Sequence, residues 1–150
     1  MTGTDRAPTI HATCVVIEGQ GVLIRGRSGA GKTSLALALL EAAENRGLLA
    51  RLVADDRVYI SAKNGRLLAQ TPAPIAGLIE RRGEGVFPIA HVPEAQVALV
   101  VDVQEAETEE SKGVETLCGI GLPLLIIPRA IKPHTDSVFK ALCFGTDSVS

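Results

Sequence analysis

Positions 26–33 read GRSGAGKT and match the phosphate-binding pattern G-x-x-x-x-G-K-[ST] at every defined position. Glycines in such a loop let the backbone curl until its N–H groups point at phosphate oxygens. The pattern predicts that Lys32 reaches the β- and γ-phosphates of a nucleotide and that the Thr33 hydroxyl binds Mg²⁺. The predicted ATP-binding residues are Gly26, Arg27, Ser28, Gly29, Ala30, Gly31, Lys32 and Thr33.

The sequence on either side of this loop supports binding over a glycine-rich turn without a ligand. Residues 22–25 form an apolar run that reads as a strand, and residues 32–46 are rich in Leu, Ala and Glu. Leu35, Leu39 and Ala43 recur at helical spacing, and Gly47 provides a stop. A strand, a loop and a helix therefore follow one another in the order that a phosphate-binding loop requires.

Further elements can be placed along the chain from its apolar runs and turn residues. The predicted class is α/β, a single P-loop domain at residues 9–150 after a flexible arm at 1–8. Asn64-Gly65 is the strongest hairpin signal. We expect strands at 9–17, 48–54, 58–61, 66–70, 97–103 and 122–127, a short helix or turn at 75–82, an exposed loop at 105–112 and a closing helix at 133–144.

Composition excludes several classes of function. The chain has 150 residues, 46% hydrophobic and 21% charged, with a net charge of −2 and no Trp. Such a balance lacks the excess of positive charge that would indicate binding to nucleic acid or to an anionic membrane. The N-terminus lacks the apolar core of a signal peptide, and no apolar run is long enough to span a membrane. Three widely spaced cysteines predict free, mostly buried thiols in a reducing cytoplasm.

Two predicted strand ends carry carboxylates that could serve a metal or a nucleophile. One is the doublet Asp55-Asp56, and the other is Asp102. By pattern alone, an apolar run closed by a single Asp fits a generic Walker B metal site, which favours Asp102. The doublet could divide the work, one carboxylate holding the water shell of the metal while the other faces a substrate hydroxyl. Each could equally be a polar strand end that caps a turn.

Five stretches, in this order, resemble the catalytic domain of the HPr kinase/phosphorylase family. They are TIHATCVVIEGQGVLIRG (9–26), GRSGAGKTSLAL (26–37), RLVADDRVYI (51–60), APIAGLIERRGEGVFPI (73–89) and GLPLLIIPRAIKPHTDS (121–137). The resemblance implies a P-loop kinase fold related to that of phosphoenolpyruvate carboxykinase. It also implies an ATP- and Mg²⁺-dependent protein-serine kinase that phosphorylates the phosphocarrier protein HPr, or an HPr-like protein, of the phosphotransferase system and so regulates carbon metabolism. Many members of the family remove that phosphate with inorganic phosphate, and they form homo-oligomers.

The resemblance also implies roles for particular residues. Asp56, or alternatively Asp55, would accept the proton of the serine, Glu80 would be a second metal ligand, and His11 would lie near the transferring phosphate. Three departures stand out. We expect a short form without the N-terminal domain of fuller members. Residues 104–113 offer only Lys112 where the family places an arginine, and the Pro-Gly-Arg turn of the family reads KPHT at 132–135.

Two alternatives remain open. A P-loop kinase of a small metabolite would need a lid of several arginines, and the sequence has only the pair Arg81-Arg82 and scattered single arginines. A non-catalytic ATP-sensing regulator is favoured by the absent loop arginine, whereas Lys32 and the acidic doublet weigh against it. For the kinase interpretation, we expect residues 80–92, with Phe87, to help form the edge that receives the partner protein.

Overall fold

The structure is a computed structural model that describes residues 9–27, 29, 31–81, 83–105, 109–129 and 134–143. Nine of the described strands form one mixed sheet, and two more form a separate hairpin. The sheet strands are β1 (Thr9–Ile10), β2 (Ala12–Ile17), β3 (Gln20–Gly26), β4 (Ala50–Ala54), β5 (Val58–Lys63), β6 (Arg66–Gln70), β9 (Glu94–Gln104), β10 (Ser111–Leu117) and β11 (Ile120–Pro128). The hairpin strands are β7 (Leu78–Arg81) and β8 (Gly85–Pro88), and the helices are α1 (Lys32–Asn45) and α2 (Thr135–Ala141).

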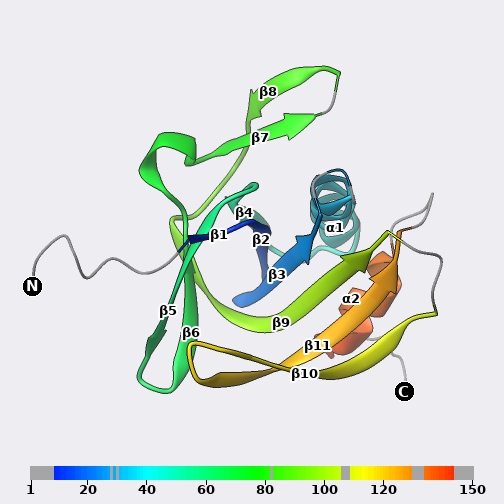
Figure 1. Cartoon of the computed structure of the whole chain (residues 1–150). Helices are drawn as coiled ribbons and strands as arrows, with labels where there is room; N and C mark the ends of the chain where they lie inside the picture. Colours follow the sequence, from blue (N-terminus) through cyan, green and yellow to red (C-terminus); the bar gives the residue numbers. More distant parts are fainter. Residues whose placement is uncertain are drawn as a thin grey trace, which may run out of the picture.

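The long strand β9 organises the sheet. Its first residues pair antiparallel with β6, and further along it pairs parallel with β3 on one side and β11 on the other. The sheet built around β9 curls, as Figure 1 shows, in keeping with the right-handed twist of strands. The parallel pairing of β3 with β9 brings Gly26, where the phosphate loop begins, level with Val103.

Two apolar clusters lie on the two faces of this sheet. The predicted helix face is confirmed, since Leu35, Leu39 and Ala43 are buried in one cluster together with Val138 and Phe139 of α2. The other cluster contains Leu23 and Val100 on the opposite face. Side chains alternate between faces along a strand, so neighbouring residues of β3 and β9 point alternately toward α1 and away from it.

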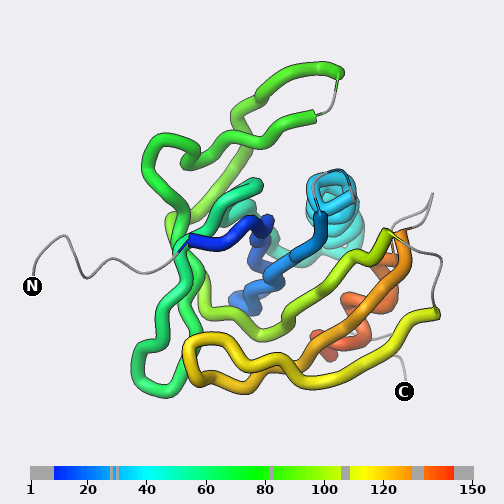
Figure 2. The backbone as a smooth tube through the Cα atoms, in the orientation of Figure 1, coloured from blue at the N-terminus to red at the C-terminus, as the bar shows by residue number. Residues whose placement is uncertain are grey.

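The structure corrects the expected helix or turn at 75–82. Residues 73–75 form a single 3₁₀ turn, and the chain then enters the β7–β8 hairpin, in which Ile79 pairs with Phe87. Figure 2 shows this hairpin extending from the main sheet on the side where α1 lies. Ile79 is buried in the cluster around α1, and Phe87 is exposed. The short apolar run around Ile79 has no clear period, so its type could not be decided locally.

The predicted exposed loop at 105–112 is also wrong at its end, because β10 begins at Ser111. Residues 106–108 lie outside the described part of the chain. Strand β10 pairs antiparallel with β11 and is mostly exposed, so it lacks the alternating apolar pattern that would have indicated a strand.

The closing helix is confirmed in its central part as α2, whereas both ends of the predicted range, 133 and 144, fall outside the described residues.

The Asn64-Gly65 hairpin is confirmed, since both residues have positive φ, 54° and 75°, between β5 and β6.

The prediction of free, mostly buried thiols is confirmed only in part. All three cysteines are free, but only Cys14 is buried, and burial raises its pKa to about 12. Cys118 and Cys143 are exposed. Within the described residues, neither helix has the length and apolar character needed to cross a membrane.

Candidate functional site

The phosphate loop has the predicted setting, because β3 leads into it and α1 begins directly after it at Lys32. Gly29 and Gly31 have φ values of 84° and 106°, which residues with a side chain rarely adopt. Such left-handed turns aim successive N–H groups inward, and the positive end of α1 adds to the attraction for an anion. Ser28 and Ala30, two of the predicted ATP-binding residues, lie outside the described residues.

Lys32 lies folded over its own loop. Its ammonium donates hydrogen bonds to the carbonyl oxygens of Gly26 at 3.0 Å and Arg27 at 3.3 Å, and the residue is buried. The cation is therefore held at the mouth of the loop where phosphate oxygens would lie. Arg27 is exposed, and its guanidinium forms an ion pair with Glu105 at 3.3 Å.

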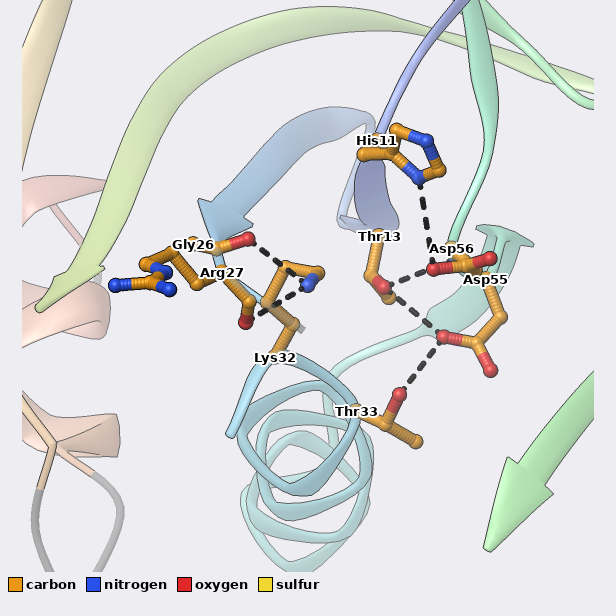
Figure 3. A network of polar contacts seen from close by, with 8 residues as sticks. All are labelled: His11, Thr13, Gly26, Arg27, Lys32, Thr33, Asp55 and Asp56. Carbon is orange, nitrogen blue, oxygen red and sulfur yellow. Dashed lines mark hydrogen bonds and ion pairs between the residues drawn. The ribbon is translucent and has the colours of Figure 1, made fainter. Parts of the chain in front are cut away.

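Asp55 is the centre of the polar network beside the loop (Figure 3). Its Oδ1 accepts hydrogen bonds from the hydroxyls of Thr13 and Thr33, both at 2.9 Å, and its Oδ2 accepts one from the backbone N–H of Glu80 at 3.0 Å. The residue is buried. Because the single proton of Thr33 Oγ1 is directed at Asp55, the lone pairs of that oxygen stay available for a metal ion.

Asp56 differs from Asp55 in exposure and in its contacts. Its side chain is 70% exposed, its φ is +74°, and its carboxylate lies 3.9 Å from Nδ1 of His11. His11 lies at the bend between β1 and β2, so the expected continuous strand at 9–17 is broken there. The doublet thus provides one buried carboxylate tied to the loop and one exposed carboxylate that an incoming group can reach.

Glu80 lies on β7. Its side chain is exposed, and its backbone N–H donates a hydrogen bond to Asp55 Oδ2. Its role as a metal ligand stays a prediction. Over the described residues, no cluster of three or more His, Cys, Asp or Glu side chains is arranged to hold a metal. The oxygens of Thr33 and Asp55 are the hard donors that Mg²⁺ prefers, and this ion usually takes further ligands from water and substrate phosphates. The donor set therefore fits Mg²⁺.

Asp102 is engaged elsewhere. It pairs in register with Arg25, and the guanidinium holds its carboxylate through two hydrogen bonds, at 2.7 and 3.0 Å. Arg25 also contacts Glu115 at 2.6 Å. Burial lowers the pKa of Arg25, but the bonds to Asp102 and Glu115 outweigh it and raise that pKa. Val101 and Val103 lie in the cluster around α1, so Asp102 points to the opposite face of the sheet.

One residue of the network was missed by sequence reasoning. Thr13 is fully buried in β2, where its hydroxyl donates to Asp55 and accepts a hydrogen bond from the backbone N–H of Asp56 at 3.2 Å. A hydroxyl inside a strand that is otherwise apolar, Ala12–Ile17, is the signal that could have drawn attention to it.

The strand, loop and helix, with a carboxylate network beside them, define a P-loop domain of the kinase type. Comparisons with known proteins agree. Residues 5–118 match the family model described as HPr Serine kinase C-terminal domain. A structure of the Hpr(Ser) kinase/phosphatase from Coxiella burnetii is similar, with a TM-score of 0.72 and 27% identity over 91% of this chain and 93% of that one.

Curated relatives agree as well. HPr kinase/phosphorylase from Geobacillus thermodenitrificans (strain NG80-2) is 36% identical over 81% of this chain, and the protein of that name from Limosilactobacillus reuteri (strain DSM 20016) is 34% identical over 80%. This chain spans 43% and 40% of their lengths, respectively. The chain belongs to the HPr serine kinase C-terminal domain family, and the family resemblance expected from the sequence is confirmed.

Proposed function

We propose that residues 9–150 form the catalytic domain of a protein-serine kinase that uses ATP and Mg²⁺ to phosphorylate HPr, or an HPr-like protein, of the phosphotransferase system. Family membership and the names of the relatives support the kinase class and the partner. The observation that carries the proposal is the paired arrangement at the strand end, where buried Asp55 is bonded to Thr33 and exposed Asp56 lies beside His11.

The loop and Lys32 would hold the nucleotide. Thr33 would hold the metal, and Asp55 would support Thr33 through its hydrogen bond. Bound Mg²⁺-ATP supplies the activated phosphoryl group and the charge that neutralises its oxygens. Lys32 would exchange its bonds to the Gly26 and Arg27 carbonyls for phosphate oxygens. Asp55 accepts the proton of the Thr33 hydroxyl, which would leave the lone pairs of that oxygen for the metal.

Asp56 would be the general base. Serine is a weak nucleophile until its proton is removed, so a carboxylate within reach of the hydroxyl accelerates transfer. Asp56 is exposed enough for a serine on a protein surface to approach, whereas Asp55 is enclosed by its three donors. His11 Nδ1 lies 3.9 Å from the Asp56 carboxylate, and in this proposal it would steady that carboxylate or a phosphate oxygen.

Intact-mass spectrometry of the HPr-like proteins from the source organism, incubated with the purified chain and Mg²⁺-ATP, tests this proposal. We expect a gain of one phosphate on serine that disappears when EDTA removes the metal. A parallel panel of sugars and organic acids identifies a metabolite kinase if ADP forms without protein phosphorylation. ATP binding without any turnover would identify a sensing regulator. Inorganic phosphate added to the phosphorylated partner, with pyrophosphate as the readout, tests the reverse reaction.

The β7–β8 hairpin is the proposed docking edge for the partner. Val86, Phe87 and Leu78 are exposed there, next to the backbone N–H of Glu80 that reaches Asp55. We expect Phe87→Ser to raise the KM for the partner by about 10-fold, because a buried aromatic contact is lost from the interface. The affinity for ATP should stay unchanged, as measured by calorimetry.

Leu49→Ser is the matched control, since Leu49 is a large apolar residue, 60% exposed, that is bonded to Glu18 before β4, whereas the hairpin is bonded to Asp55 after β4. Equal KM values for the two variants, or a crosslink that places the partner far from 80–92, would remove the hairpin from the docking surface.

Self-association is a further expectation of the kinase proposal. Among the described strands, β10 pairs with β11 alone and so presents an open edge, with Val114 exposed on it. We expect light scattering at micromolar concentration to give a mass at least twice that of the chain, and Val114→Glu to lower it. A wild-type chain that is monomeric under these conditions would contradict this expectation.

A further inference from the structure

The Thr13 hydroxyl joins the two carboxylate-bearing residues of the site. It has one proton, which it donates to Asp55 Oδ1 at 2.9 Å, and it accepts the backbone N–H of Asp56 at 3.2 Å. The residues on either side of it in β2, Ala12 and Cys14, are fully buried, as is Thr13 itself. Water therefore cannot replace the hydroxyl without a rearrangement of the core.

We propose that Thr13 is a positioning residue that holds Asp55, which supports the metal site, and Asp56, the base, in one fixed geometry. The inference rests on the proposed function, in which Asp55 supports the metal site and Asp56 takes the proton of the serine. Asp55 Oδ1 takes a second donor beside Thr33, and the Asp56 N–H takes an acceptor. Only a hydroxyl at position 13 can satisfy both from one atom.

The backbone of Asp56 requires such an anchor. Its φ of +74° lies in the left-handed region, which Asp adopts more readily than most residues with a side chain but still at a cost in free energy. Two hydrogen bonds hold this peptide in place, one from its own N–H to Thr13 Oγ1 and one from the N–H of Ala12 to its carbonyl oxygen at 3.2 Å. Without the first bond, the residue is freed to relax toward an ordinary conformation, and its carboxylate then turns away from the loop.

Asp55 is less dependent on Thr13. It keeps the hydroxyl of Thr33 and the N–H of Glu80 when Thr13 no longer donates. Loss of the hydroxyl should therefore weaken catalysis far more than nucleotide binding. If Thr13 only filled space in the core, its substitution would change the stability of the fold. The presence of a hydroxyl in Thr13→Ser and its absence in Thr13→Val would then make no difference to the transfer rate.

The experiment compares Thr13→Val, which keeps the shape and removes the hydroxyl, with Thr13→Ser, which keeps the hydroxyl. We expect the single-turnover transfer rate to fall about 10- to 100-fold in Thr13→Val, with ATP affinity within about 3-fold of wild type, and to recover to within about 3-fold in Thr13→Ser. Thr116→Val, on the exposed edge strand β10, controls for the chemistry of the substitution. Thr13→Ala replaces the valine variant if the latter does not fold.

Hydrogen exchange at the Asp56 amide gives a readout that needs no partner protein. The amide should be protected in wild type and Thr13→Ser and should exchange faster in Thr13→Val. If the wild-type chain transfers no phosphate, the proposed function fails, while this exchange still decides the role of Thr13. Equal transfer rates for Val and Ser, or equal Asp56 protection in both, would overturn the inference.

Discussion

Asp56→Asn should slow phosphoryl transfer to the partner protein by about 100-fold or more, while ATP binding stays close to that of the wild-type chain. The amide keeps the shape of the carboxylate but cannot take the proton of the serine. The side chain is exposed beside His11, and no described residue of the loop or of α1 donates a hydrogen bond to it, so nucleotide affinity has little reason to change. Single-turnover transfer at saturating Mg²⁺-ATP measures the rate.

Asp102→Asn is the matched control, since it makes the same chemical change at the other strand end. We expect a mild effect on transfer, because Asp102 is bonded to Arg25 on the sheet face away from α1. Arg25 keeps its second partner, Glu115. A crippled Asp102 variant beside a nearly normal Asp56 variant would reject Asp56 as the base and favour the generic Walker B interpretation.

Lys32→Ala should also reduce transfer by about 100-fold or more, with the fold intact, because it removes the cation that would face the β- and γ-phosphates in the proposed kinase. It leaves the carbonyls of half-buried Gly26 and exposed Arg27, which we expect water to hydrate once the side chain is removed. Lys63→Ala is the control, an exposed lysine at the end of β5. Calorimetry with ATP and single-turnover kinetics provide the readouts. Unchanged nucleotide affinity and turnover in Lys32→Ala would show that the loop has been wrongly assigned.

The parts of the fold that were predicted correctly are those fixed by neighbours in sequence. The loop at 26–33 and the Asn64-Gly65 turn each carry their own conformational signal within a few residues. Strand β10 and the β7–β8 hairpin depend instead on pairing and on exposed edges, which leave little apolar pattern. Their type is decided by tertiary contacts that no local window contains.

The candidate site divides in the same way. Lys32, Thr33 and the acidic doublet could be selected from motifs, and the structure brings Thr33 and Asp55 into contact. Their roles in catalysis stay predictions. Thr13 was not selected, because its hydroxyl in an apolar strand is the sole local signal and its bond to Asp55 joins positions 42 residues apart. The pattern alone also favoured Asp102, since it does not reveal that Arg25 lies opposite that carboxylate on the neighbouring strand.

The hydrogen bonds of Asp55 have a thermodynamic consequence for the hairpin. One carboxylate joins the start of α1, through Thr33, to β7, through the N–H of Glu80. A ligand that alters the first of these bonds changes the free energy of the second. Thermodynamic linkage makes this effect reciprocal. If bound nucleotide changes the affinity of the hairpin for the proposed partner by some factor, the bound partner changes the affinity for the nucleotide by the same factor.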